Sequence, residues 1–390
     1  MTHAKLVVEN GALTLRHGSD PLHLNSDSVA SFFEPPAPLS SDQIRARVDE
    51  IVRGSGKTST LPLTGFVLPG DTVAIPVSGQ PDEVCRILLP LIAEFGKSGT
   101  PESAIRIICQ SGSEGSYREI LPSTVSIESH DPDSEEKSAY LANSRRGSRV
   151  YLNREMLDCD VIVPVIVPDP VGMAMRRGVP GGFWPEFSRK ATQEKLAVEF
   201  RSDARKVRHE IREVAWLAGV AVTVVGLPGS SGIAAVAGIP PAEVQAWVHG
   251  RIDHLWGFDF EAQADSVLLE ADAPGGLCGE RLRAFLRLAG KLAARYRRVV
   301  LCLKFDDATI EAMEQELRTG KKATPSWNSQ LKRIGTSASV SLLGNLPDDI
   351  ADECEIVLLE EPEDVERQVN HAGRWIVVPD AWAVRARFEN

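Results

Sequence analysis

Short, wholly apolar strand patterns alternate with amphipathic helix patterns along this chain. The segment Thr72–Val77 is a continuous apolar run, and the helix pattern Pro81–Phe95 follows it. A second apolar run, Ala104–Cys109, comes next, and a later one, Val161–Val167, is rich in β-branched residues. Strands without a polar face are typical of parallel sheets that are covered by helices. The pattern therefore predicts an α/β fold with mostly parallel sheets.

A second series of strands and helices begins after about residue 262. Its expected elements are Ser266–Glu270, Gly279–Tyr296, Arg298–Leu303, Ser339–Leu343, Glu355–Leu359 and Trp375–Val378. A chain of 390 residues also exceeds the usual size of one domain. We expect an N-terminal domain over residues 1–255, a C-terminal domain over 262–372, and a tail, 373–390, that returns to the N-terminal domain.

The charge balance argues against two classes of partner. Asp and Glu number 54 against 43 Lys and Arg, which gives a formal net charge of −11. An acidic surface is repelled by a phosphate backbone and by anionic lipids, so neither nucleic acid nor a membrane is expected as a partner. No apolar stretch reaches the roughly 20 residues that a membrane span needs.

The six cysteines include no C-x-x-C pair. Cys109 and Cys302 lie within apolar runs, where buried free thiols are common. The first residues show no basic segment followed by an apolar one, so no secretory signal is expected. These features predict a cytoplasmic protein in a reducing compartment.

Loops at the carboxyl ends of the predicted strands hold the candidate site residues, as is usual in α/β folds. Gln80 lies in the loop after Val77, and Glu114 lies in the small-residue loop after Cys109. Glu114 is the candidate acid or base, and an ordinary solvated glutamate is the alternative. The backbone amides of this loop could bind an anion, or the loop could be an ordinary strand-to-helix turn.

A later loop, residues 168–184, carries Arg176 and Arg177 beside a Gly-rich turn. Two adjacent guanidinium groups could hold a carboxylate or phosphate, and a flexible surface loop is the alternative. The cluster His130-Asp131-Pro132-Asp133 could ligate a metal or form a polar turn, and no metal site is assigned. The glycine patterns of dinucleotide and P-loop phosphate sites are absent from the sequence.

Several longer motifs occur in a characteristic order. They are Glu34-Pro-Pro-Ala-Pro-Leu39, Leu68-Pro-Gly-Asp-Thr-Val-Ala-Ile75, Leu89-Pro-Leu-Ile92, Gly99–Ile108, Ser129-His-Asp-Pro132, Gly147–Asn153, Glu210–Gly219 and Trp327-Asn-Ser-Gln330. Over roughly residues 4–380, this order resembles the nickel-dependent lactate racemase family. The resemblance implies two α/β domains around an interdomain cleft, formed near residues 78–81, 111–115, 174–184 and 327–330.

The resemblance also implies a chemistry. Family members carry a lysine-tethered nickel-pincer nucleotide, which takes a hydride from the α-carbon of a 2-hydroxy acid and returns it to either face. This chain departs from the family motifs, with Gln80 in place of an arginine, Glu114 and Ala174 in place of histidines, and Trp184 in place of the tether lysine. Lys190 is the only lysine near the tether position. The cofactor is therefore left unknown, and we expect no lysine-tethered nickel nucleotide.

Two functions remain open on this scaffold. One is a racemase or epimerase of 2-hydroxy acids or sugar acids with an altered active site, in which Glu114 acts as acid or base. The other is a non-catalytic binding or regulatory protein. Both imply a small anionic ligand, for which the candidate binding residues are Gln80, Arg176, Arg177, Arg283, Trp327 and Gln330. Trp184 is expected to fill the space that the family leaves for the pyridine ring of its cofactor.

Overall fold

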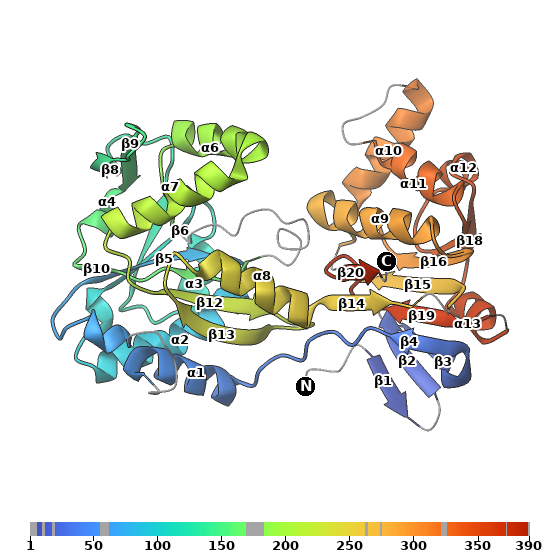
Figure 1. The fold of residues 1–390 in the computed structure, drawn as a ribbon, viewed down its shortest axis with the longest axis horizontal. Coiled ribbons are helices and arrows are strands. Elements are labelled where there is room, and N and C mark those ends of the chain that lie inside the picture. Colours follow the sequence, from blue (N-terminus) through green and yellow to red (C-terminus); the bar gives the residue numbers. More distant parts are fainter. Residues whose placement is uncertain are drawn as a thin grey trace. The chain divides into compact units, whose positions relative to one another are not determined.

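The computed structural model describes residues 6–9, 12–17, 20–54, 62–168, 183–261, 264–273, 275–320, 326–371 and 373–388. The chain divides into two compact units (Figure 1). The inserted unit comprises residues 37–252, and the flanking unit combines residues 1–36 with residues 253–390. Both units are α/β, as the alternation of strands and helices predicts.

The main sheet of the inserted unit has the strand order β13-β12-β11-β5-β6-β7. Its parallel strands are β5 (Val73–Ser78), β6 (Ile105–Gln110), β7 (Ser126–His130), β11 (Val165–Ile166) and β12 (Thr223–Pro228). β13 (Ile233–Ile239) runs antiparallel to β12, and β10 (Val161–Ile162) adds a short pairing with β5. β8 (Ser138–Asn143) and β9 (Arg149–Asn153) form a separate antiparallel pair.

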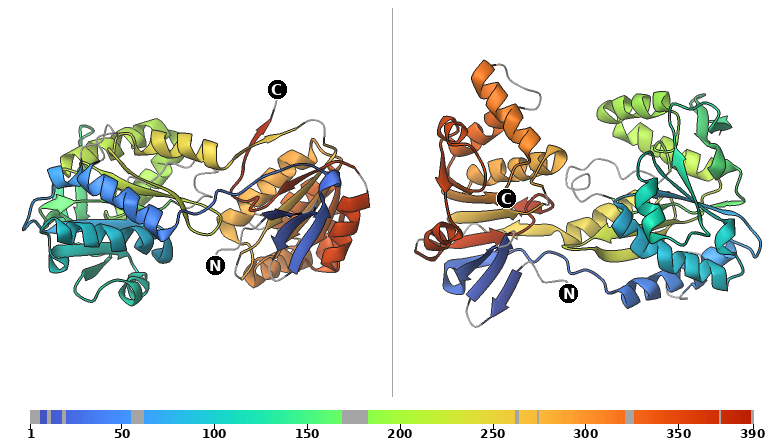
Figure 2. Two further views of the ribbon diagram at one scale, coloured as in Figure 1. Left: turned by 90° about the horizontal axis from the view of Figure 1, so that it is seen from below. Right: turned by 180° about the vertical axis from the view of Figure 1, so that it is seen from behind.

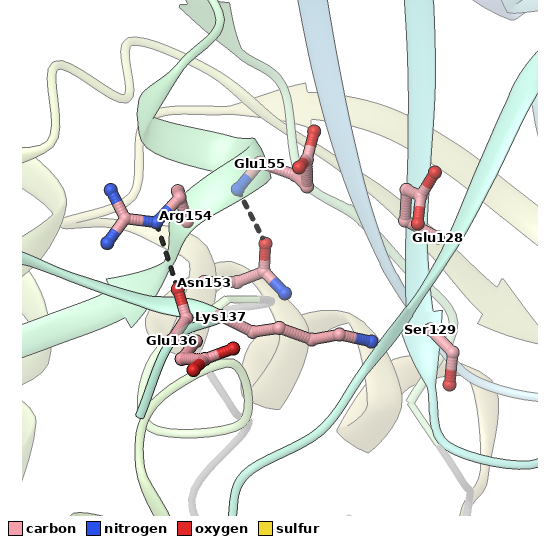
Figure 3. Close-up of a pocket in the computed structure, with 7 residues that line it drawn as sticks. All are labelled: Glu128, Ser129, Glu136, Lys137, Asn153, Arg154 and Glu155. Atoms are coloured by element: carbon pink, nitrogen blue, oxygen red, sulfur yellow. Dashed lines mark hydrogen bonds between the residues drawn. The ribbon is translucent and has the colours of Figure 1, made fainter. Parts of the chain in front are cut away.

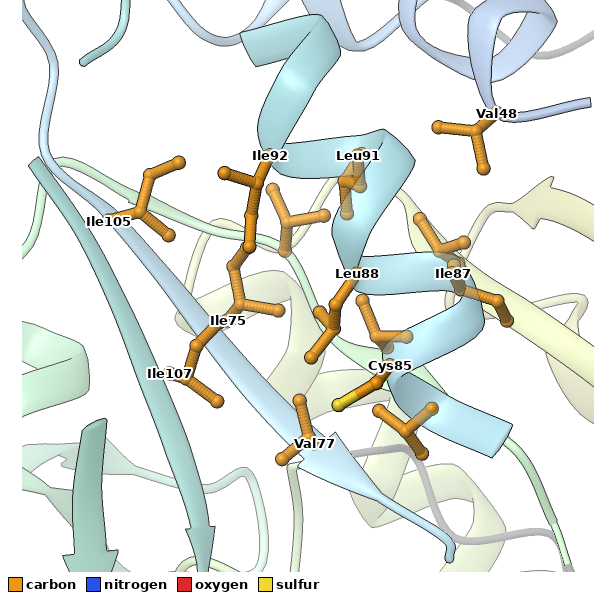
Figure 4. Packing of buried hydrophobic residues seen from close by; sticks show 14 of the residues in the cluster. Val48, Ile75, Val77, Cys85, Ile87, Leu88, Leu91, Ile92, Ile105 and Ile107 are labelled. Atoms are coloured by element: carbon orange, nitrogen blue, oxygen red, sulfur yellow. The ribbon is translucent and has the colours of Figure 1, made fainter. Parts of the chain in front are cut away.

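Helices cover both faces of this sheet, which is why its strands have no polar face. One face carries α1 (Ser41–Arg53), α2 (Pro81–Lys97) and α3 (Glu114–Ile120), and the other carries α6 (Lys190–Ser202) and α7 (Ala204–Leu217) (Figure 1). α4 (Arg154–Leu157) and α8 (Val244–Leu255) are the remaining described α-helices of this part of the chain, and Leu63–Gly65 and Glu102–Ala104 are 3-10 helices. Figure 4 shows α2 directing Cys85, Leu88 and Ile92 toward Ile75 and Ile107 of the sheet. Each such apolar side chain contributes roughly 1.5 to 3 kcal/mol when fully buried.

One predicted strand of this unit is broken in the structure. The expected continuous strand over residues 161–167 is divided into β10 and β11 around Pro164. Proline lacks the backbone N–H that a central strand needs for pairing on both sides. The Pro164 carbonyl still takes part in the sheet, because it accepts the Val224 N–H at 2.8 Å.

The flanking unit has a six-stranded parallel sheet of order β18-β17-β16-β15-β19-β4. Its strands are β4 (Val29–Phe32), β15 (Ser266–Ala271), β16 (Arg298–Leu303), β17 (Ser339–Leu343), β18 (Ile356–Leu359) and β19 (Trp375–Val378). Its helices are α9 (Gly279–Ala293), α10 (Asp307–Thr319), α11 (Trp327–Gly335), α12 (Asp348–Glu353) and α13 (Pro362–His371). β14 (Gly257–Phe260) pairs with β20 (Arg385–Phe388), and β1 (Leu6–Glu9), β2 (Ala12–His17) and β3 (Asp20–Asn25) form an antiparallel sheet.

The division between the units corrects the boundaries expected from the sequence. Residues 1–36 belong with the C-terminal part of the chain, because β4 pairs with β19 and the β1–β3 sheet packs beside α13 (Figure 2). The tail does not return to the other unit either, since β20 pairs with β14 inside the flanking unit. These pairings join segments more than 100 residues apart, which local sequence patterns do not encode.

Candidate functional site

The order of strands in the inserted unit places a topological switch point beside β5. From β5 the chain proceeds to β6 and β7 on one side, and it later returns to β11 and β12 on the other. In open α/β sheets, ligands bind at the carboxyl ends of the strands where the order reverses in this way. The corresponding position lies between Ser78, at the end of β5, and Val167, just beyond β11, where the Val167 N–H donates to the Ser78 carbonyl at 2.8 Å.

The loop after β5 approaches this position so closely that it requires glycine. Gly79 has φ +130°, and a Cβ atom there would lie 2.5 Å from the Val167 carbonyl oxygen. Gln80, the predicted ligand-binding residue of this loop, is the exposed N-cap of α2 and makes no side-chain capping bond. The Gly79 backbone, the Ser78 hydroxyl and the exposed side-chain amide of Gln80 therefore lie at the end of β5.

Glu186 supplies a titratable group at the same place. Burial raises the pKa of its carboxyl group from the ordinary range to about 7, and the nearby Ser78 side chain acts in the opposite direction. Its Oε2 atom is inaccessible to solvent and has no hydrogen-bond partner among the described residues. A carboxyl group with this pKa can both donate and accept a proton near neutral pH.

A buried histidine anchors the segment that carries Glu186. His130 Nε2 donates to the Ser188 carbonyl at 3.1 Å, and its Nδ1 accepts from Asn153 Nδ2 at 3.2 Å. Burial lowers the pKa of His130, which favours the neutral ring that these two bonds require. Both ring nitrogens are therefore occupied within the fold, so the hypothesis of a polar turn fits His130 better than a metal ligand. Across the described ranges, no three His, Cys, Asp or Glu side chains are arranged to hold a metal ion.

Trp184 is buried in the hydrophobic core between the sheet and the α6–α7 face. It clusters with Phe183, Phe187 and Leu196 and is 1% exposed. Its indole Nε1 finds no hydrogen-bond partner in the described part of the chain. Lys190, further along, pairs at the surface with Asp133 at 3.2 Å.

Glu114 lies at the carboxyl end of β6, as expected, and it is held as a carboxylate. Its own backbone N–H, the Gly112 N–H at 3.0 Å and the Ser129 hydroxyl all donate to it and lower its pKa. A lowered pKa favours the ionised form, so Glu114 suits the role of a hydrogen-bond acceptor better than that of a general acid. Sequence reasoning selected this glutamate and missed Glu186, although a single charged residue inside the aromatic run 183–187 is a signal for a buried carboxyl.

A pocket of about 170 Å³ opens beside the hydroxyl that holds Glu114. It is lined by Glu128, Ser129, Glu136, Lys137, Asn153, Arg154 and Glu155 (Figure 3). Figure 3 shows the Lys137 side chain lying across the pocket with its ammonium toward Ser129. Asn153 connects the pocket to His130, since it bonds the ring through Nδ2 and accepts the Glu155 N–H through Oδ1 at 2.9 Å.

The other predicted site residues are distributed over the chain. Arg176 and Arg177 lie outside the described residues. Arg283, Trp327 and Gln330 belong to the flanking unit, where Arg283 pairs with Glu280 at 3.0 Å and Trp327 is buried at the start of α11. Gln330 bonds back to the Ser326 carbonyl at 3.4 Å.

Comparisons with known proteins show a similar fold in solved structures but no match in sequence. No family model matches the sequence, and no curated protein matches it. The chain is similar to the solved structure of the lactate racemase apoprotein from Thermoanaerobacterium thermosaccharolyticum, with a TM-score of 0.62 and 14% identity over 96% of this chain and 100% of that chain. A structural-genomics protein from Thermotoga maritima aligns over 92% of this chain and 100% of that chain, with a TM-score of 0.48 and 10% identity. In its architecture, this protein therefore has a fold like that of lactate racemase.

Proposed function

We propose that this protein binds a small 2-hydroxy acid or sugar acid at the switch point of the inserted unit, on a racemase-like scaffold with an altered active site. The observation that carries the proposal is the Glu186 carboxyl, whose Oε2 atom is inaccessible to solvent and whose pKa is raised to about 7, beside Ser78 where the strand order reverses. A fold like that of lactate racemase supports the choice of ligand class. The Ser78–Glu186 pair was not among the residues selected from the sequence.

The chemistry of this pair suits a hydroxy acid. In its protonated form, Glu186 donates a hydrogen bond to a ligand carboxylate, and in its ionised form it accepts one from a ligand hydroxyl. The Ser78 hydroxyl can do either. Because the pKa of Glu186 lies near 7, a proton can move between this carboxyl and a bound ligand at neutral pH. We therefore assign Glu186 as the acid–base group of an isomerase reaction, with Glu114 as a fixed carboxylate.

The residues present do not fit a lysine-tethered nickel nucleotide. Trp184 stands at the position that the resemblance aligns with the tether lysine, and its ring is packed among Phe183 and Phe187. An indole offers no amine for a covalent bond, and burial of a side chain this large is worth a few kcal/mol, which opposes its displacement by a cofactor ring. Glu114, at the position of a catalytic histidine, has its carboxylate engaged by Gly112 and Ser129.

A second candidate is a binding or regulatory protein without catalysis. It is favoured by the same packing of Trp184 and by the engagement of both His130 ring nitrogens inside the fold. Under this candidate, Glu186 would only recognise the ligand. The free state of all six cysteines suits a reducing, cytoplasmic location for either function, and no described helix is long and apolar enough to cross a bilayer.

The two candidates are separated by one set of measurements on the full chain. A panel of D- and L-2-hydroxy acids and sugar acids is screened by thermal shift, since a ligand that binds the native state raises Tm. Ligands that bind are then incubated with the protein in D2O and examined for inversion and for exchange of the α-hydrogen. Inversion that is lost in Glu186→Gln supports the racemase, and binding without inversion supports the second candidate.

No stabilisation by any hydroxy acid or sugar acid would overturn both candidates. Elemental analysis for nickel and the intact mass of the purified protein test the cofactor separately. Stoichiometric nickel together with a covalent mass increment would show that the assignment of Trp184 to the tether position is wrong.

A further inference from the structure

The pocket beside Glu114 is chemically distinct from the switch point. Its seven lining residues come from β7, from the turn before β8 and from the junction of β9 with α4. A volume of about 170 Å³ corresponds to about five or six water molecules at ~30 Å³ each, which is enough for a very small metabolite. What such a pocket binds depends on which of its charged groups are already satisfied within the fold.

Two of the charged lining residues are used to build the pocket. Arg154 donates through Nε to the Glu136 carbonyl at 3.0 Å and through Nη2 to the Ser138 carbonyl at 3.4 Å. Glu155 forms an ion pair with Arg106. Arg154 therefore fixes the turn that carries Glu136 and Lys137, and Glu155 is neutralised by a residue outside the pocket.

Three charged groups remain. Within the described residues, the Lys137 ammonium makes no hydrogen bond or ion pair that would satisfy it, and the same holds for the Glu136 carboxylate. Glu128 accepts a long bond of 3.4 Å from the Ser126 hydroxyl through Oε1 only. Figure 3 shows the Lys137 ammonium and the Glu128 carboxylate on the same side of the pocket. The pocket thus offers an ammonium that is unpaired among the described residues and two carboxylates to a ligand, beside the Arg154 guanidinium, whose charge is not neutralised by its two carbonyl partners.

This combination selects among small molecules by charge. A monoanion would gain from Lys137 and be repelled by Glu128 and Glu136, and a monocation would leave Lys137 unsatisfied. A zwitterion satisfies both signs, with its carboxylate on Lys137 and its ammonium on the glutamates. We propose that this pocket is a binding site for a small α-amino acid, separate from the hydroxy-acid site at the switch point.

The test compares ligands of similar size and different charge on the intact protein. L-Alanine, L-lactate and isopropylamine are titrated by calorimetry at neutral pH and low salt. L-Alanine is expected to bind about tenfold or more tightly than either of the others at this pocket, as the loss of one charge-assisted contact predicts. The comparison does not depend on the proposed hydroxy-acid function, because the component assigned to the pocket is the part that Lys137→Gln removes.

Substitutions of single lining residues test which charged groups of the pocket bind the ligand. Lys137→Gln and Glu128→Gln should each weaken L-alanine binding by about tenfold, and Glu128→Gln should bring L-lactate closer to L-alanine. Lys195→Gln, which changes a lysine on α6 outside the pocket, should bind L-alanine as the wild type does. Equal binding of L-alanine and L-lactate in the component that Lys137→Gln removes, or unchanged L-alanine binding by Lys137→Gln, would overturn the proposal.

Discussion

Two glutamates of the inserted unit show how surroundings decide the chemistry of one residue type. Burial beside Ser78 raises the pKa of Glu186 to about 7, whereas N–H and hydroxyl donors lower the pKa of Glu114. Environments that separate the pKa values of two carboxyls in this way can assign them different roles. Under the proposed function, Glu186 is the group that exchanges protons and Glu114 is the fixed anion.

The raised pKa of Glu186 predicts a pH-dependent stability. Between the unfolded pKa near 4.5 and the folded value of about 7, the native state binds more protons, so its free energy of unfolding falls as pH rises. Glu186→Gln removes this loss. We expect the variant to match the wild type near pH 5 and to exceed it by roughly 2 to 3 kcal/mol at about pH 8.5, as measured by urea unfolding. The exposed Glu194→Gln is the control, and parallel pH profiles for Glu186→Gln and wild type would contradict the assignment.

At the scale of elements, α1 and α2 are joined by a buried carboxylate. Glu94 of α2 has a side chain only 3% exposed, and it pairs with Arg53 of α1 at 2.9 Å and with Lys97 of its own helix. Burial alone would raise the pKa of Glu94, but the hydrogen bonds from Lys97 and Arg53 outweigh burial and lower it. This pair joins two of the helices that cover one face of the sheet.

Removal of the Glu94 carboxylate should therefore be costly. We expect Glu94→Ala to lower the free energy of unfolding by about 2 to 3 kcal/mol at pH 7. Because the folded pKa is lowered, the contribution of Glu94 should be present above pH 4.5 and be lost as the pH falls below it. Glu50→Ala, which removes an exposed partner of Arg47 on α1, should cost about 0.5 kcal/mol or less. If Glu94→Ala and Glu50→Ala lowered the free energy of unfolding equally in urea at pH 7, the ion pair between Glu94 and Arg53 would not be what stabilises the contact of α1 with α2.

The junction of β5 with its loop gives a second test at this scale. Gly79→Ala would force a Cβ atom against the Val167 carbonyl in a backbone conformation with φ +130°, and we expect a loss of about 2 to 4 kcal/mol in stability. Gly112 also has positive φ, but open space surrounds its missing Cβ. Gly112→Ala should cost about 1 kcal/mol. Thermal unfolding of both variants measures the difference, and a tolerated Gly79→Ala would show that the switch point is not closely packed.

At the scale of the whole molecule, one unit is inserted into the other. Two hydrophobic clusters among the described residues of the inserted unit have all their buried members within residues 44–236. The flanking unit, in contrast, needs both ends of the chain, because Leu13 and Leu22 pack with Leu268 and Val369 in one cluster. The inserted unit is thus formed by one continuous segment of the chain, whereas the flanking unit is formed by two separate segments.

This difference predicts which fragments fold. Residues 37–252 expressed alone should show a cooperative urea transition and helical circular dichroism, since both faces of their sheet are covered by their own helices. Residues 253–390 alone should lack stable structure, because β19 loses β4 and the cluster around Leu268 loses the β1–β3 sheet. Fusion of residues 1–36 to residues 253–390 through a Gly-Ser linker should restore folding. A cooperative transition in residues 253–390 alone would refute the assignment of the N-terminal strands.

Some features of this structure follow from local sequence patterns, and others depend on contacts between segments that are far apart in the chain. Local sequence patterns predict the α/β class, most strands and helices, and the position of Glu114 at a strand end, because apolar periodicity and turn residues act over a few neighbours. The order of motifs in the sequence also resembles that of lactate racemases. Long-range contacts decided that β4 pairs with β19 and that Ser78 meets Glu186. The last of these creates the candidate site, since the pKa of a carboxyl depends on burial and on partners that folding brings from distant parts of the chain.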